Sequence, residues 1–233
     1  MSMSILKNLK SYRKGIAYVL DTLYLAPTLR SPAERTMRDC RGENFAMREN
    51  SGFSEEEFSE PTSSELSNIV EEYYDEVSGS LGSMGENDLG VVFQGPGDPL
   101  EACDVVIDTV RSISRNGISF RVNTLGLCDS TITETLISSD VVAKGDQDQR
   151  RETRISKVSV FLPASDPKMY DELIRPKKSQ GFQKACSFIA QLADAGIHVE
   201  CTAVDRPDVR VSEIEKLCLG LGALDFRIRP YFP

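Results

Sequence analysis

Cysteine and histidine are the residues of this sequence best suited to metal binding or nucleophilic chemistry, but their spacing favours neither. The chain has one histidine, His198, and six cysteines, which are Cys40, Cys103, Cys128, Cys186, Cys201 and Cys218. No two cysteines lie within four residues of each other, unlike the paired ligands of zinc sites. His198 is the only histidine available to a Ser–His–Asp or Cys–His arrangement, and its place in the stretch IHVECTAV indicates a strand residue instead. We therefore predict no catalytic residues and no metal ligands.

The stretch VVFQGPGDPL, residues 91–100, contains a turn that could hold a ligand. An apolar run stops there at two glycines, two prolines and Asp98. Glycine at a strand end lets another backbone or a small ligand approach closely. The aspartate could pair with a cationic group of a ligand, or it could cap its own backbone in an ordinary strand-to-helix turn. The residues alone leave both roles open.

Length, composition and charge favour a soluble globular protein. A chain of 233 residues with 40% hydrophobic content suits one α/β domain. The net charge of −9 argues against a nucleic-acid partner, and no apolar run approaches the roughly 18 residues of a membrane span. Scattered cysteines without a secretory signal indicate reduced thiols, so we expect a cytoplasmic protein. A protein partner cannot be read from the sequence.

The N-terminal segment, residues 1–21, is basic. Its first twenty residues contain Lys7, Lys10, Arg13 and Lys14 but no acid. Such a segment is compatible with a mitochondrial or plastid transit peptide, and equally with a basic surface helix or loop of a cytoplasmic protein.

The predicted elements alternate between strand and helix. Apolar runs predict strands at 22–28, 90–94, 118–124, 157–163 and 197–205, with a polar turn after the fourth. Helical periodicity predicts helices that start near Pro61, with Leu66, Ile69, Val70 and Tyr73 on one face, and others at 100–115, 131–139, 181–196 and 211–222. Loops are expected at 29–52, 78–88 and 143–154. This order implies parallel strands in five or six β/α units, either an open sheet or an incomplete barrel.

Three polar clusters follow predicted strands, namely Gly95–Asp98, Asn123–Thr124 and Ser165–Asp166. Because the carboxyl ends of parallel strands share one edge, we expect these clusters to line a common rim.

The succession of GPGDPL, RVNTLGL and VSVFLPASDPKMYDELIRP resembles the radical S-adenosylmethionine (SAM) superfamily, and most closely its short TatD-associated proteins. The likeness covers roughly residues 22–229 and is strongest from Lys157 to Val204. It implies an α/β fold, an incomplete (β/α)6 TIM-like barrel over residues 22–233. It also implies a site for S-adenosyl-L-methionine, with Gly95 and Gly97 against the methionine end, Asp98 on its ammonium group, and Asn123 and Thr124 as polar partners.

The same resemblance implies a [4Fe–4S] cluster held by three cysteines, spaced C-x3-C-x2-C in the loop after the first strand. When TLR is aligned with the TNR usual in the family, Ser31, Arg35 and Arg38 stand at those positions within the degenerate loop 29–52. Serine is a poor iron ligand and arginine is a permanent cation, and Cys40 is the only thiol nearby. We therefore predict a pseudoenzyme without iron–sulfur chemistry, which could still bind S-adenosyl-L-methionine or another small molecule.

Two other interpretations stay open. The chain could be an active radical SAM enzyme whose sequence is faulty or incomplete at the cluster loop. It could also be a non-catalytic interaction protein that docks a basic partner on its acidic segment, EEEF through EEYYDEV. In the degenerate relative, Arg35 and Arg38 could receive an anion.

Overall fold

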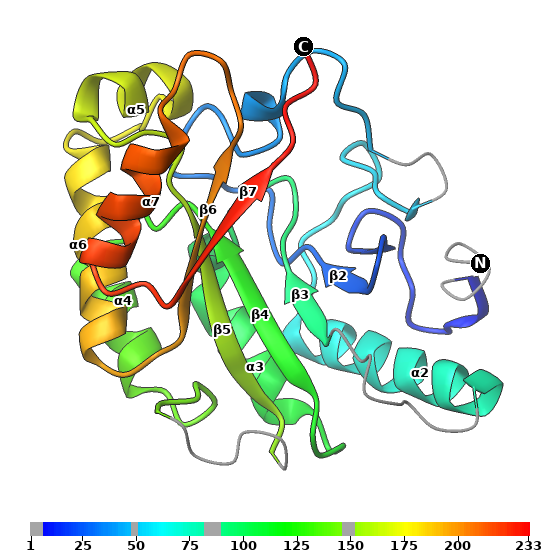
Figure 1. Cartoon of the computed structure of the whole chain (residues 1–233). Helices are drawn as coiled ribbons and strands as arrows, with labels where there is room; N and C mark the ends of the chain where they lie inside the picture. Colours follow the sequence, from blue (N-terminus) through cyan, green and yellow to red (C-terminus); the bar gives the residue numbers. More distant parts are fainter. Residues whose placement is uncertain (1–6, 48–50, 82–89, 146–151) are drawn as a thin grey trace. The chain divides into compact units, whose positions relative to one another are not determined.

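The computed structural model describes residues 7–47, 51–81, 90–145 and 152–233 (Figure 1). The chain divides into two compact units. Unit 1 comprises Met1–Arg30, Met47–Val122 and Asp148–Ile155, and unit 2 comprises Ser31–Ala46, Asn123–Gln147 and Ser156–Pro233. No helix of the described residues is long and apolar enough to cross a lipid bilayer.

Unit 1 is built on short buried strands. β1 (Ala17–Val19) pairs antiparallel with β2 (Leu23–Leu25), which pairs in parallel with β3 (Val91–Phe93). β3 in turn pairs in parallel with β4 (Ser119–Thr124). All residues of β1, β2 and β3 are buried, which agrees with their nearly continuous apolar sequence. The strands predicted at 22–28, 90–94 and 118–124 are therefore confirmed, whereas β1, inside the basic segment 1–21, was not predicted.

Helix α2 (Ser63–Leu81) begins at a capping box. The Thr62 hydroxyl accepts a hydrogen bond from the Glu65 amide at 3.2 Å, and the Glu65 carboxylate accepts one from the Thr62 amide at 2.8 Å. Leu66, Ile69 and Val70 are fully buried as predicted, but Tyr74 rather than Tyr73 completes the buried face. The loop predicted at 78–88 is wrong for 78–81, which belong to α2, and its remainder lies outside the described residues.

The helix predicted at 100–115 is shorter and has two parts. A 3₁₀ turn, η3 (Pro99–Ala102), leads into α3 (Cys103–Ser112), which packs against α2 (Figure 1). Ile113 is already extended, so the helix ends before the Asn116-Gly117 pair that was predicted to close it.

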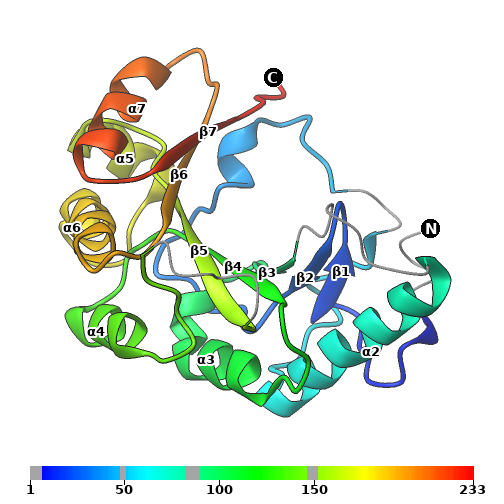
Figure 2. The same ribbon diagram turned by 60° about the horizontal axis from the view of Figure 1, so that its bottom comes forward.

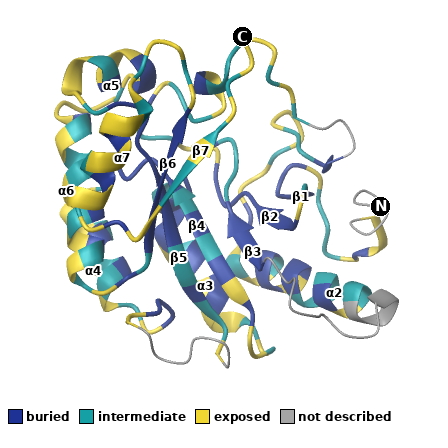
Figure 3. Ribbon diagram, viewed as in Figure 1, coloured by how far each residue is buried: buried dark blue, intermediate teal, exposed yellow. Residues whose placement is uncertain are grey.

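Unit 2 contains parallel strands covered by helices. β5 (Arg154–Phe161), whose first two residues belong to unit 1, pairs in parallel with β6 (Val199–Val204), and β6 with β7 (Asp225–Arg229). The helices are α4 (Ser130–Ser138), α5 (Pro167–Ile174), α6 (Gly181–Asp194) and α7 (Val211–Gly220). In Figure 2, α6 and α7 lie along the outer side of β6, and both contact it. β6 is buried throughout, whereas β7 is partly exposed (Figure 3).

Helix α5 stands where the sequence predicted a polar turn, and that prediction is wrong. The Asp166 carboxylate accepts a hydrogen bond from the Met169 amide at 3.0 Å, and Pro167 occupies the first helical position. Tyr170, Leu173 and Ile174 are buried and most of the exposed residues are polar, so the helix is amphipathic.

Hydrogen bonds link the seven strands in the order β1-β2-β3-β4-β5-β6-β7, which is their order along the chain. The pairs β2–β3, β3–β4, β5–β6 and β6–β7 are parallel, and β1–β2 is antiparallel. The mixed α/β architecture with a mostly parallel sheet is therefore confirmed, and the antiparallel β1 is an addition to it.

Candidate functional site

The glycine turn after β3 is packed against its own chain. A Cβ atom on Gly95 would lie 2.6 Å from the Cβ atom of Ala26, and one on Gly97 would lie 2.5 Å from the carbonyl oxygen of Arg30. The Asp98 amide donates a hydrogen bond to the same Arg30 oxygen at 2.8 Å. Packing against residues 26–30 is therefore sufficient reason for both glycines, whether or not a ligand also approaches them.

Asp98 has the capping role that the sequence left open. It is 5% exposed, and its Oδ1 accepts a hydrogen bond from the Leu100 amide at 3.0 Å at the start of η3. A contact between its carboxylate and a ligand ammonium group stays a prediction.

Asn123 and Thr124 end β4 directly after Val122, which lies opposite Phe93 of β3. Both belong to unit 2, whereas the glycine turn belongs to unit 1. The Thr124 hydroxyl is buried and accepts a hydrogen bond from the Gly126 amide at 3.0 Å. In the third predicted cluster, Asp166 caps α5, so two of the three clusters include an aspartate that caps a helix. Their common rim stays a prediction.

The loop predicted to have lost the cluster is folded onto the end of α5. Its backbone donates hydrogen bonds from Glu34 to Arg175 (3.0 Å) and from Arg35 to Ile174 (3.1 Å). The Ser31 hydroxyl accepts a hydrogen bond from the Ala33 amide at 3.3 Å, and Arg38 is exposed immediately before the 3₁₀ helix η1 (Asp39–Arg41). Two of the three aligned positions therefore carry permanent cations, and the third carries a hydroxyl that the turn already uses.

Cys40 is unsuited to iron ligation. It is 2% exposed, and its thiol donates a weak hydrogen bond to the Leu173 carbonyl at 3.7 Å. Burial raises the pKa of Cys40 to about 12, whereas a metal ligand must be a thiolate. Within the described part of the chain, no group of three or more His, Cys, Asp or Glu side chains could hold a metal ion. The residues present do not fit a [4Fe–4S] cluster.

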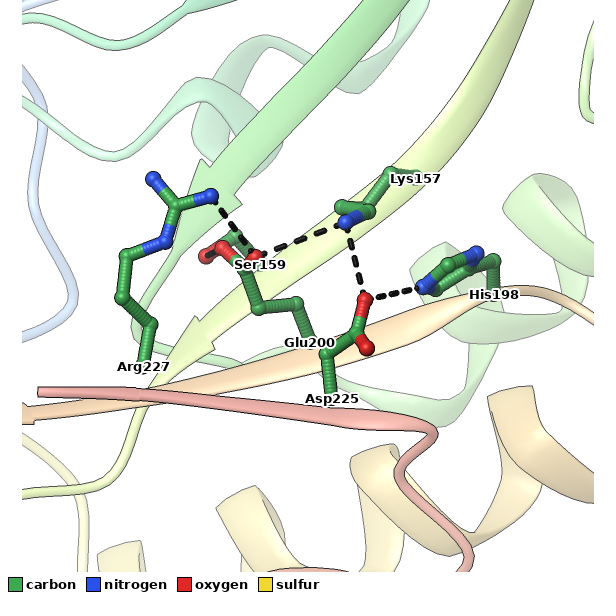
Figure 4. Close-up of polar contacts among 6 residues, drawn as sticks. All are labelled: Lys157, Ser159, His198, Glu200, Asp225 and Arg227. Carbon is green, nitrogen blue, oxygen red and sulfur yellow. Dashed lines mark hydrogen bonds and ion pairs between the residues drawn. The ribbon is translucent and has the colours of Figure 1, made fainter.

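A polar network on one face of β5, β6 and β7 was not predicted (Figure 4). Register places Ser159 opposite Glu200, and Glu200 opposite Asp225. The Glu200 side chain is 3% exposed and accepts hydrogen bonds from Ser159 (3.1 Å), Arg227 (3.0 Å) and Lys157 (3.4 Å). Strand alternation turns these side chains away from the buried Val158 and Val160.

The network has an exposed margin at Asp225. This carboxylate lies 3.0 Å from Lys157 Nζ and 2.7 Å from His198 Nε2. Lys157 and then His198 hold the pKa of Asp225 below its ordinary value. Lys157 thus contacts both carboxylates, the buried one and the half-exposed one. With each carboxylate matched by cations, the arrangement is suited to fixing the three strands rather than to nucleophilic chemistry.

The network could not be found from spacing along the chain. Lys157 and Asp225 are 68 residues apart, and Ser159 and Glu200 are 41 apart. The available signal was charged or polar residues at alternate positions in otherwise apolar strands, namely Lys157, Ser159, His198, Glu200, Asp225 and Arg227.

No family model and no curated protein matches this sequence. Among solved structures, the fold is similar to that of Streptococcus suis SuiB bound to the precursor peptide SuiA, with 15% identity and a TM-score of 0.59 over 91% of this chain and 40% of that chain. SuiB bound to S-adenosylmethionine has 13% identity and a TM-score of 0.59 over 91% of this chain and 42% of that chain. TYW1 with a lysine–pyruvate adduct bound has 12% identity and a TM-score of 0.56 over 91% of this chain and 65% of that chain.

This chain spans 40% to 42% of the length of SuiB and 65% of that of TYW1. At these identities the likeness shows the fold alone, which the chain shares with both proteins over 91% of its length.

Proposed function

We propose that this chain is a cluster-free relative of the radical SAM enzymes, nearest to the short TatD-associated proteins, which binds a small molecule without generating a radical. What supports the proposal is the fold similarity to SuiB and TYW1, together with the alignment implied by the resemblance, which puts Ser31, Arg35 and Arg38 where the family has its cluster cysteines. The strands would form an incomplete (β/α)6 barrel of the kind that the superfamily uses. The protein would be cytoplasmic, without a nucleic-acid or membrane partner.

The alternative of an active enzyme with a faulty or incomplete sequence needs its own test. The hydrogen bonds of residues 34–35 to residues 174–175 are between backbone groups, so they do not depend on which side chains the loop carries. Sequencing of the transcript across residues 29–52 would distinguish the two alternatives, because an active enzyme would encode three cysteines there.

S-adenosyl-L-methionine is the first ligand to test. One of the similar structures has it bound, and the resemblance assigns Gly95, Gly97, Asp98, Asn123 and Thr124 to its site. Because Oδ1 of Asp98 accepts from Leu100, the same carboxylate would serve both the cap of η3 and a ligand ammonium group. Another small molecule with a cationic group could use the same contact.

Anaerobic reconstitution with iron and sulfide tests the loss of the cluster. We expect the wild-type protein to bind less than about one iron per chain and to lack the broad absorption near about 400 nm that Fe–S clusters give. The triple variant S31C/R35C/R38C restores the C-x3-C-x2-C spacing and is the matched comparison. Robust colour in the wild-type protein, with about four irons per chain, would overturn the proposal.

Calorimetry with S-adenosyl-L-methionine tests the ligand. The variant Asp98→Asn keeps an oxygen that can cap Leu100 and removes the charge that would pair with an ammonium group. If Asp98 binds the ligand, affinity should fall at least about tenfold, as expected for loss of a charge-assisted hydrogen bond. Asp166→Asn is the control, because Asp166 caps α5 in the same way. An unchanged affinity for Asp98→Asn would remove Asp98 from the site.

A further inference from the structure

The guanidinium group of Arg41 lies against two neighbouring aromatic rings in unit 2. Its Cζ atom lies 4.2 Å from the ring centroid of Phe45 and 5.1 Å from that of Phe232. The two ring centroids are 5.7 Å apart, and Arg41 Nε donates a hydrogen bond to the Pro230 carbonyl at 3.3 Å. Stacking on rings fixes a guanidinium plane without using its outer N–H groups.

The outer edge of Arg41 has no carboxylate partner. Among the residues that the structure describes, Arg41 forms no ion pair, and its two Nη atoms have no hydrogen-bond acceptor. The neighbouring Arg206 is already committed, because it makes two hydrogen bonds to Asp208, at 2.9 and 2.7 Å, and one to the Cys40 carbonyl at 3.1 Å. The carbonyl oxygen of Pro233 is bound by Asn44.

The electrostatic surroundings of Arg41 also favour an anion. Burial and then the positive charge of Arg229 lower the pKa of Arg41. A bound anion would offset this unfavourable interaction.

The backbone fixes the geometry before any ligand arrives. The Phe232 amide donates a hydrogen bond to the Arg41 carbonyl at 2.7 Å, and the Asn44 amide donates one to the Phe232 carbonyl at 3.4 Å. Gly42 has a φ of +97°, and a Cβ atom there would lie 1.9 Å from the Phe232 oxygen, so only glycine allows this approach. A site arranged in advance loses little entropy when it binds.

We propose that Arg41, which packs against Phe45 and Phe232 and whose outer edge has no acceptor among the described residues, is a binding site for an oxyanion, either a carboxylate or a phosphate group of a small molecule. The planar fork of arginine matches either group with two parallel hydrogen bonds. The site lies on the loop that the resemblance assigns to the cluster. It holds whether or not the chain binds S-adenosyl-L-methionine, because none of the residues predicted to contact that ligand takes part.

Titration of the full chain with inorganic phosphate and, separately, with malonate tests the site. The measurement is the NMR shift of the Arg41 Nε–H signal, identified by its disappearance in Arg41→Lys, with calorimetry in low-chloride buffer as the second readout. We expect saturable binding of at least one of the two anions. Tighter binding of phosphate would point to a phosphorylated ligand, and tighter binding of malonate to a carboxylate ligand.

Variants distinguish anion binding by the guanidinium group of Arg41 from an effect of the protein's overall charge. Arg41→Ala should weaken binding at least about tenfold, the effect of one lost charge-assisted hydrogen bond. Phe232→Leu should weaken it less, because the charge stays while one stacking ring is lost. Arg111→Ala removes the same charge from an exposed position in unit 1 and should bind like the wild type. Absence of saturable binding of both anions, or equal affinity in the wild type and Arg41→Lys, would overturn the proposal.

Discussion

Glu200 offers the most direct test of the network on β5, β6 and β7. Glu200→Ala removes the acceptor of Ser159, Lys157 and Arg227. The buried Ser159 hydroxyl would then lack its partner, at a cost of about 1–3 kcal/mol. Lys157, whose side chain is 24% exposed, would also lose its buried counter-ion. Arg227 is 41% exposed, so water can replace its contact with Glu200, and it adds little to the loss of stability.

We therefore expect the free energy of unfolding to fall by about 3 kcal/mol, the upper end of the cost of an unpaired buried hydroxyl, with little added by Lys157 because Asp225 still pairs with it. Urea unfolding followed by far-UV circular dichroism measures this loss through linear extrapolation. For a chain of this length the loss corresponds to a melting temperature lower by about 6–12 °C.

Asp225→Ala is the matched control for this experiment. Asp225 also contacts Lys157, but its side chain is 48% exposed, so its removal should cost less than about 1 kcal/mol. Glu200→Gln retains an oxygen that can accept from Ser159, so its loss of stability should lie between those of the two alanine variants. A loss below about 1 kcal/mol in Glu200→Ala, or an equal loss in both alanine variants, would refute the reasoning that burial sets the strength of this network.

Three further predictions concern single residues. Gly97→Ala should destabilise the protein by about 1–3 kcal/mol in the same unfolding assay, because its Cβ would meet the Arg30 oxygen, whereas Gly220→Ala, with nothing within 4 Å of its Cβ, should be neutral or stabilising. Cys40, with a pKa of about 12, should react with iodoacetamide at pH 8 far more slowly than the partly exposed Cys128, and equal rates by peptide mass mapping would contradict its burial. The pKa of Asp225 is lowered in the folded state, so this residue stabilises the protein above its ordinary pKa of 3.8, and that stabilisation is lost as the pH falls through the lower folded-state pKa. Asp225→Asn should therefore flatten the pH dependence of stability in this acidic range and leave the pH dependence near neutrality unchanged.

Elements with a strong local signal could be predicted from the sequence. The 3.6-residue period of α6 places Ala185, Phe188, Ile189 and Leu192 in the core, and apolar runs mark the parallel strands. Helix α5 was missed because it has only eight residues, about two turns, although Asp166 and Pro167 gave a recognisable start. β1 has only three residues, too few for a period to appear.

The site depended on contacts that no local pattern contains. The glycines of the turn were recognised, but their partners at 26–30 are about seventy residues away in the chain. Arg41 was not singled out from the sequence, because Phe232 is brought to it only by the pairing of the loop with the C-terminal residues. Residue types therefore predicted which positions are unusual, and only the fold determined what each one touches.

Loop 31–46 is held by peptide hydrogen bonds, a buried thiol and arginine–aromatic stacking. None of these contacts is attacked by dioxygen or removed by a chelator. Under the proposed function, this loop would therefore keep its conformation without an inorganic centre, in air and without added iron or sulfide.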